Sequence, residues 1–389
     1  MLSSLRRRYD NARDWLRRPK DLIQANRTPF EVIHEQDIIR LRYYPPLTSE
    51  HITVDGHEMP VSRTRQQVPL VLVTPLAANT LLYDLFEERS LVRYLRARGF
   101  EVYLIDWGRP GRRHDHWSLE HYFAEHLPVL LDKVRAHSGE RRLALHGWSF
   151  GALFSYAYTA LGEDPDIAAL ALVGAPGDYH ANGALGVQYR RLSQQLRWLK
   201  RRTGRHVHQL PAPLLRSPGW VNALSFKLIT PVSTLKGYLD LWRRLEDRDY
   251  VSSHATNAAF LDDMYAYPGA VIQDIVRHLW TDNCVARGRL PMRHPRGNLS
   301  AVTVPTLLVT GRQDTIVTRE CSLALRVQMP LAPITHHEVS GGHMGILGGS
   351  QAPRDNWPVV ADWLIRQCRD ARVDPRIEED AAPPARQAS

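Results

Sequence analysis

The chain has 389 residues, 43% hydrophobic and 23% charged, a composition that permits a large buried core. Its formal net charge of +9 predicts attraction to something anionic, such as lipid headgroups, a charged granule surface or a phosphate-bearing substrate, and we expect no nucleic-acid partner. Three widely spaced cysteines exclude a disulfide framework and show no metal-ligand spacing, and no apolar run approaches the ~20 residues of a membrane span. We therefore expect a cytoplasmic enzyme domain with an insertion and without a metal or redox cofactor.

Residues 1–20 form a basic segment with seven lysines and arginines. Four apolar residues recur there at helical spacing and predict one stripe, made of Leu5, Tyr9, Ala12 and Leu16. No uninterrupted apolar region follows the charges, so a secretory signal is excluded, and Asp10 and Asp14 do not fit a transit peptide. Two interpretations stay open, a helix on an anionic surface and a solvated helix packed on the body of the protein.

Strands and helices alternate from residue 68 onward. Residues 28–46 predict a lead-in hairpin or edge strands, and short apolar runs predict buried strands at 68–75, 100–106 and 167–174. Helices are predicted at about 91–98 and 119–137. This rhythm indicates a mostly parallel sheet with right-handed crossovers.

A sharp turn lies at Gly147-Trp148-Ser149-Phe150-Gly151, between an apolar strand at 143–145 and a helix-like run. The pattern G-x-S-x-G arises by chance in roughly one chain of this size in ten. In that case it would be a plain β-turn without a catalytic role. Between a strand and a helix, however, it is typical of the nucleophile elbow of an α/β-hydrolase, in which small residues flank the serine. The fold class predicted is therefore α/β, with Ser149 as the nucleophile.

The rhythm breaks between residues 177 and 300, where the pattern is mainly helical. Many aromatic residues lie there, among them Tyr189, Trp198 and Trp280, together with a basic cluster at 190–205. An insertion at this point would form a cap over the carboxyl ends of the strands, where open α/β sheets bind ligands. The aromatic residues could line an acyl pocket, although most of them are expected to form the core of the cap itself.

The sheet resumes at residues 302–310, and Asp314 follows that strand. His343 lies in a glycine-rich loop before a last helix at 357–368, so the order serine, aspartate, histidine is that of the α/β-hydrolase triad. Two competing candidates are weaker, because His146 lies on a buried strand and Asp106 comes too early in the chain. The backbone N–H of Phe150 and that of Leu76 are the expected oxyanion donors.

These elements predict a basic helix and lead-in at 1–45, core halves at 46–176 and 301–370, a cap at 177–300 and a disordered tail at 371–389, which is rich in proline, alanine and acidic residues.

The chain resembles the polyhydroxyalkanoate synthase family, particularly the shorter synthases that act with a second subunit. The resemblance is carried by Thr-Pro-Phe-Glu-Val at 28–32, Leu-Ile-Asp-Trp-Gly-Arg-Pro at 104–110, the elbow, Asp-Asn-Cys at 282–284, Gln-Asp-Thr-Ile-Val at 313–317 and Ser-Gly-Gly-His-Met-Gly at 340–345. It implies a capped α/β-hydrolase that transfers hydroxyacyl groups carried by coenzyme A, with Asp314 and His343 in the family's catalytic positions. Homodimers, a second subunit and a polyester granule are the partners it suggests.

One departure from the family is in the elbow, where those synthases use cysteine and this sequence has Ser149. Acyl groups move between two thiols at little cost, whereas transfer to a serine gives an oxygen ester and loses the driving force of the thioester. Hydrolysis of hydroxyacyl esters or thioesters is therefore expected, with polymer synthesis as the alternative. A non-catalytic protein that binds granules or membranes is a further alternative, against which the complete triad argues.

Overall fold

The computed structural model describes residues 2–204, 210–229, 231–294 and 296–370. The tail predicted at 371–389 lies outside these residues. Eight strands form one sheet in the order β1-β2-β8-β5-β9-β10-β11-β12. Their bounds are β1 Glu31–Gln36, β2 Ile39–Tyr44, β5 Leu70–Val73, β8 Val102–Asp106, β9 Leu143–Trp148, β10 Ile167–Val173, β11 Thr306–Gly311 and β12 Ile334–Val339.

The sheet is parallel from β8 to β12, and the β1–β2 hairpin adds two antiparallel strands at one edge. Every residue of β5, β8, β9 and β10 is buried, as expected of parallel strands with helices on both faces. Two small hairpins lie outside this sheet, with the bounds β3 His51–Val54, β4 His57–Pro60, β6 Asp84–Phe86 and β7 Arg89–Ser90. The predicted α/β class is confirmed.

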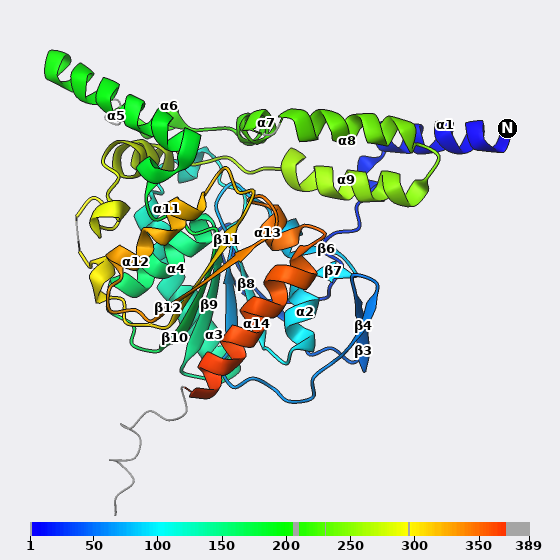
Figure 1. Ribbon diagram of the computed structural model, residues 1–389, viewed down its shortest axis with the longest axis horizontal. Helices are drawn as coiled ribbons and strands as arrows, with labels where there is room; N and C mark the ends of the chain where they lie inside the picture. Colours follow the sequence, from blue (N-terminus) through cyan, green and yellow to red (C-terminus); the bar gives the residue numbers. More distant parts are fainter. Residues whose placement is uncertain (1, 205–209, 230, 295, 371–389) are drawn as a thin grey trace, which may run out of the picture.

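Helices cover both faces of the sheet (Figure 1). One apolar core lies between the sheet and α3 (Leu127–Ser138), α4 (Phe150–Ala160) and the π-helical turn His121–His126. The other lies between the sheet and α2 (Leu91–Ala97), α13 (Gly345–Gly348) and α14 (Ala352–Asp370). The short helices α11 (Arg319–Leu323) and α12 (Leu325–Gln328) follow β11.

The residues between β10 and β11 are mainly helical, and they form the upper part of the molecule in Figure 1. Their helices are α5 Gly183–Thr203, α6 Ala212–Leu215, α7 Gly219–Ile229, α8 Pro231–Arg243, α9 Arg248–Asp262, α10 Gly269–Asp274 and the π-helical turn Ile275–Thr281. Short 3-10 turns complete the chain at Pro19–Leu22, Thr80–Tyr83, Arg112–His114, Tyr179–Ala181, Val285–Arg287 and Leu299–Ala301. We refer to the helices α5–α10 as the cap.

The N-terminal helix α1 (Leu2–Arg17) packs against α9, beside α8, in a small separate core. The contact is made by Ala12 and Trp15, and by the amide of Asn11, which donates to the Leu245 carbonyl at 2.8 Å. Of the predicted stripe, only Ala12 faces this core, while Leu5, Tyr9 and Leu16 are exposed. The helix is thus packed on the body, but the face that packs is not the one that the apolar spacing indicated.

Candidate active site

Ser149, Asp314 and His343 come from three loops that follow parallel strands in one half of the sheet. Ser149 follows β9, Asp314 follows β11 and His343 follows β12, which is the last strand of the sheet. Because these strands are parallel, their carboxyl ends meet at one edge, beneath the cap. The topology therefore brings together residues that are up to 194 positions apart in the chain.

The turn that carries Ser149 is strained, with φ 56° and ψ −120°, and α4 begins at the next residue. A Cβ on Gly147 would lie 2.5 Å from the backbone of Ala152, and a Cβ on Gly151 would overlap the carbonyl oxygen of Val73. Both glycines are thus required for α4 to approach β5 and β9 closely. This packing exposes the Ser149 side chain at the apex of the turn.

A chain of hydrogen bonds joins the three side chains. The Nε2 atom of His343 lies 2.9 Å from the Oγ of Ser149, and its Nδ1 lies 2.8 Å from the Oδ2 of Asp314. The other oxygen of Asp314, Oδ1, accepts backbone N–H bonds from Ile316 at 2.9 Å and Val317 at 2.8 Å. These two bonds fix the carboxylate, so that its second oxygen is presented to the imidazole.

Further residues, which the sequence did not single out, support this arrangement. The indole N–H of Trp148 donates to the His343 carbonyl at 3.1 Å, and Gly174 leaves room for the imidazole, because a Cβ there would lie 3.1 Å from it. The side chain of Asn182 donates to the Ile316 carbonyl at 2.6 Å and accepts from the Thr318 N–H at 2.8 Å. No sequence pattern predicts these contacts of Trp148 and Asn182, because each is made to a backbone group that lies far away in the chain.

The motif Asp-Asn-Cys at 282–284 has a structural role beside the site. The side chain of Asn283 accepts from the Tyr179 N–H at 3.0 Å and donates to Asp178 at 2.7 Å. It thereby fixes the loop that follows β10, from which Tyr179 reaches the cavity. Cys284 itself is buried, and burial raises the pKa of its thiol to about 12.

The two expected oxyanion donors belong to the segments that follow β9 and β5. Phe150 is the first residue of α4, where backbone N–H groups have no partner within the helix and the helix dipole favours negative charge. Leu76 lies in the loop after β5, next to Ala77, which has a positive φ of 61°. The Trp107 indole fixes this loop by donating to the Thr74 carbonyl at 2.8 Å. Both Phe150 and Leu76 line the same cavity as Ser149.

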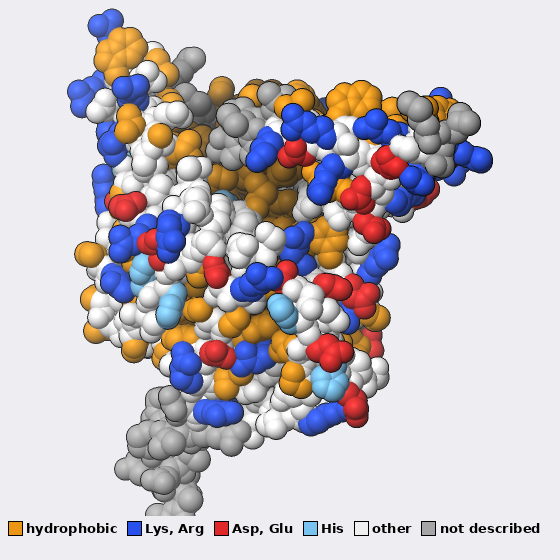
Figure 2. All heavy atoms as spheres, turned by 45° about the vertical axis from the view of Figure 1, so that its right-hand side comes forward, with side chains coloured by type: hydrophobic (Ala, Val, Ile, Leu, Met, Phe, Trp, Pro, Cys, Tyr) orange, Lys and Arg blue, Asp and Glu red, His pale blue; other side chains and the backbone are white. Residues whose placement is uncertain are grey.

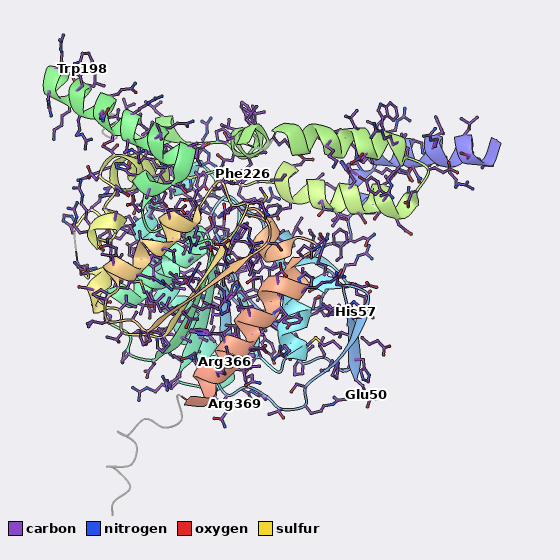
Figure 3. The ribbon with its side chains drawn as sticks, viewed as in Figure 1. Glu50, His57, Trp198, Phe226, Arg366 and Arg369 are labelled. Atoms are coloured by element: carbon purple, nitrogen blue, oxygen red, sulfur yellow. The ribbon has the colours of Figure 1, made fainter. Side chains whose placement is uncertain are left out.

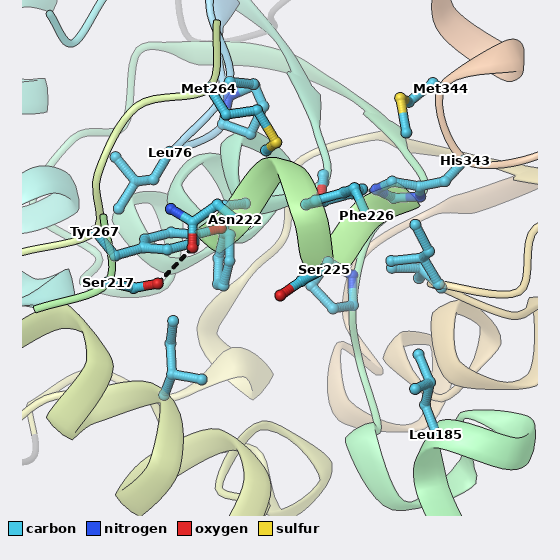
Figure 4. Close-up of a pocket in the computed structure, with 18 of the residues that line it drawn as sticks. Leu76, Leu185, Ser217, Asn222, Ser225, Phe226, Met264, Tyr267, His343 and Met344 are labelled. Carbon is cyan, nitrogen blue, oxygen red and sulfur yellow. Dashed lines mark hydrogen bonds between the residues drawn. The ribbon is translucent and has the colours of Figure 1, made fainter. Parts of the chain in front are cut away.

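This cavity has a volume of about 330 Å³ and lies between the sheet edge and the cap (Figure 4). Its wall is mainly apolar and includes Leu185, Phe226, Phe260, Met264, Ile275 and Met344. Phe226 comes from the underside of α7 and lies near His343 in the close-up. Such a cavity matches an apolar acyl chain with its carbonyl placed at Ser149.

Six aromatic residues of the segment 177–300 line this cavity, namely Tyr179, Tyr189, Phe226, Phe260, Tyr267 and Trp280. Four others are exposed, namely Trp198, Trp220, Tyr238 and Trp242. The cavity-lining residues also lie in or pack against apolar cores, as expected of most aromatics in this segment, although these cores are largely shared with the sheet. Figure 3 shows the contrast, with Trp198 near the outer end of α5 and Phe226 between α7 and the core.

The two competing candidates, Asp106 and His146, are not part of the hydrogen-bonded chain of Ser149, His343 and Asp314. Asp106 is paired with Arg42 at 2.5 Å. His146 is buried inside β9, and this burial lowers the pKa of its imidazole to about 4. Cys321 and Cys368 are buried as Cys284 is, and burial raises the pKa of each thiol to about 12. Their low tendency to form thiolates makes these three cysteines poor nucleophiles.

Within the described ranges, no group of three or more histidine, cysteine, aspartate or glutamate residues is arranged to hold a metal ion.

The chain is similar to two curated proteins and to one solved structure of other organisms. The chain is 26% identical over 365 residues to the poly(3-hydroxyalkanoate) polymerase subunit PhaC of Haloferax mediterranei, a match that covers 92% of this chain and 68% of the relative. It is 25% identical over 348 residues to the subunit of the same name from Synechocystis, covering 89% and 86%. Among solved structures, the monoacylglycerol lipase of Paleococcus ferrophilus matches with a TM-score of 0.46 and 21% identity, covering 79% of this chain and 100% of the lipase.

A family model described as the alpha/beta hydrolase fold matches residues 68–349, which include Ser149, Asp314 and His343. This match spans the sheet from β5 to β12 together with the cap between them. The chain belongs to the α/β hydrolase fold family.

Proposed function

We propose that this protein is a serine acyl-transfer enzyme that hydrolyses hydroxyacyl esters or thioesters, with Ser149, His343 and Asp314 as its catalytic triad. The observation that carries the proposal is the continuous chain of hydrogen bonds from Ser149 through His343 to Asp314 at the floor of an apolar cavity. Membership of the α/β hydrolase fold family and relatives named as polymerases of hydroxyalkanoates support acyl transfer as the reaction class.

In the proposed mechanism, the Nε2 of His343 takes the proton of the Ser149 hydroxyl as its oxygen attacks the acyl carbonyl. Asp314 holds the proton on Nδ1 and stabilises the imidazolium that forms. The N–H groups of Phe150 and Leu76 receive the negative oxygen, and one such donor is typically worth about 2.7–4 kcal/mol. His343 then protonates the leaving thiol or alcohol, and in the second half-reaction it activates the water that releases the acid.

A serine rather than a cysteine as nucleophile is supported by the burial of all three cysteines, whose thiols all have pKa values near 12. An acyl-serine is an oxygen ester, so passing the chain back to a thiol would be unfavourable, whereas release to water is favourable. This argument supports hydrolysis over repeated chain transfer.

The polar side chains of the cavity also bear on this choice. Asn182, Ser217, Asn222 and Ser225 line the cavity, but each is engaged in hydrogen bonds within the protein. Ser217, for example, donates to the Asn222 side chain at 2.6 Å, as drawn in Figure 4. A polymerase needs a group that holds the acceptor hydroxyl near the acyl-enzyme. Because Ser217 and Ser225 donate their hydroxyl protons within the protein, they could hold an acceptor hydroxyl only by accepting its proton.

Polymer synthesis is the second candidate, because the relatives carry that activity in their names. Both relatives are named as subunits. If this protein synthesises polymer, we therefore propose that it acts together with a second subunit.

The test is a panel of hydroxyacyl esters and hydroxyacyl-CoA thioesters, assayed beside labelling with a serine-reactive phosphonate. We expect labelling of the wild type at Ser149 and turnover of at least one member of the panel, both abolished in Ser149→Ala. A Ser149→Ala variant that is labelled and turns over like the wild type would overturn the serine mechanism.

A further inference from the structure

The outer edge of the cap carries an apolar surface that its own folding does not explain. The helices α7, α8 and α1 lie in one row along the top of Figure 1. Six exposed side chains of this row are Trp220, Leu224 and Leu228 on α7, Trp242 on α8, and Tyr9 and Leu16 on α1. We call them the outer row. Trp220, Trp242 and Leu16 are each 70% exposed, and Figure 2 shows hydrophobic side chains along this upper edge.

The spacing of the outer-row residues on α7 indicates one exposed apolar face of that helix. Trp220, Leu224 and Leu228 follow each other at intervals of four, which places them on one side of α7. The opposite side of α7 is occupied by Ala223, which packs in a small core, and Phe226, which lines the cavity. The helix thus has two apolar faces, and the fold of the cap accounts for one of them. Three large apolar side chains exposed along one face of a helix are typical of an interaction site.

The charges around the outer row are mainly positive. The first 20 residues contain seven lysines and arginines but two aspartates. Arg6, Arg7 and Arg13 form ion pairs with acidic side chains, and Lys227 of α7 is paired with Asp262. Among the ion pairs of the described residues, none involves Arg17, Arg18, Lys20 or Lys236. Lysine and arginine side chains appear beside the hydrophobic ones along the same edge in Figure 2. A partner for this face must combine a negatively charged surface with an apolar interior directly beneath it.

We propose that the outer row docks on an anionic phospholipid surface. Tryptophan, tyrosine and leucine on the apolar face with lysine and arginine beside it are the features of helices that lie in the plane of a membrane interface. A second copy of this chain fits less well, because a symmetric contact would bring two positively charged rims together. Among the described residues, the helices are too short or too polar to span a bilayer.

Docking in this way would place the cavity close to the lipid. Because α7 carries the outer row on one face and Phe226 on the other, about one helix diameter of roughly 10 Å separates the lipid surface from the acyl cavity. Acyl donors dissolved in the lipid would then be close to Ser149. The docking itself does not rest on the proposed acyl transfer, since it concerns the opposite face of α7.

The experiment is sedimentation of the full chain with vesicles of phosphatidylcholine, alone or with about one third phosphatidylglycerol. The Ser149→Ala background is used throughout, so that binding is measured without turnover. Two variants test the two halves of the surface, Trp220→Ser/Trp242→Ser for the apolar row and Arg17→Glu/Arg18→Glu for the charge. Val327→Ser/Leu331→Ser is the matched control, because these residues are 76% and 64% exposed on a different part of the molecule.

We expect binding to the anionic vesicles, reduced roughly tenfold or more by either test variant and unchanged in the control, with equal melting temperatures. Raising the salt from about 0.1 M to about 1 M should also weaken binding, because the Debye length falls from about 10 Å to about 3 Å. Equal binding to neutral and anionic vesicles, no binding, or test variants that bind like the control would overturn the proposal. So would a lipid-independent dimer, seen by light scattering, that Trp220→Ser/Trp242→Ser dissociates. None of these results depends on whether the wild type hydrolyses esters.

Discussion

The substitution Asp314→Asn tests how the carboxylate acts on His343, and the structure fixes its outcome. The Oδ1 of Asp314 accepts two backbone N–H bonds, from Ile316 and Val317, while Oδ2 faces the Nδ1 of His343 at 2.8 Å. An asparagine must keep its oxygen at the Oδ1 position, because the reverse orientation would point its NH₂ group at two N–H donors. Its NH₂ group therefore faces His343.

The consequence is a change of tautomer. With an N–H donor opposite it, Nδ1 of His343 becomes an acceptor and the proton moves to Nε2, which lies 2.9 Å from the Ser149 oxygen. That nitrogen can no longer accept the serine proton. In serine hydrolases with this arrangement the loss is about 10⁴ in kcat. A factor of this size corresponds to about 5.5 kcal/mol of transition-state stabilisation.

The assay is hydrolysis of a soluble ester at saturating concentration, with the rate of phosphonate labelling as a second readout. We expect kcat and the labelling rate to fall together by roughly four orders of magnitude, with little change in KM. The melting temperature serves as the control, because the two backbone bonds are kept. A loss of less than about tenfold would refute the reasoning, since it would mean that Asp314 does not set the tautomer of His343.

Three further outcomes follow from the packing. Gly151→Ala should lower the free energy of unfolding in urea by about 3 kcal/mol or more, because its Cβ overlaps the Val73 carbonyl, whereas Gly345→Ala meets nothing within 4 Å and should be near neutral. The pKa of His146 is about 4 in the folded state against an ordinary 6.5, so the unfolded chain takes up a proton first and stability falls as the pH drops from 7 to 4. Over this range the free energy of unfolding in urea should fall by roughly 3 kcal/mol more for the wild type than for His146→Gln. Equal losses would contradict the buried neutral imidazole. Phe226→Ala should raise kcat/KM for long acyl chains relative to short ones by roughly tenfold, and an unchanged ratio would mean that Phe226 does not limit the cavity.

Much of the sheet could be predicted from the sequence, because its central strands are continuous apolar runs between turns. The edge strand β12 could not, since its residues Thr335, His336, His337 and Glu338 are polar and lie at the border of the sheet. The last helix begins at Ala352 rather than near Trp357, because its first turns are polar and contain little apolar periodicity. The hairpin of β3 and β4 was missed for a similar reason, its burial being slight.

For the candidate site, the chain order indicated Ser149, Asp314 and His343, and the strand ends bring them together. The supporting contacts of Trp148 and Asn182 depend on backbone carbonyls and N–H groups of distant loops, so no local pattern could reveal them. Nor could composition tell which aromatics of the cap face the cavity and which face outward. The boundaries of the cap at residues 177 and 300 and the catalytic roles themselves stay predictions.

The most direct test of the proposed function is the ratio of products from a hydroxyacyl-CoA. After complete turnover by the wild type, free CoA and free hydroxy acid are quantified in the same sample. Because acyl-Ser149 is expected to pass its acyl group to water, the two should appear in equal amounts, without insoluble material. Release of CoA in excess over free acid, with an insoluble polyester accounting for the difference, would contradict hydrolysis. It would show that a serine in the elbow supports repeated chain transfer.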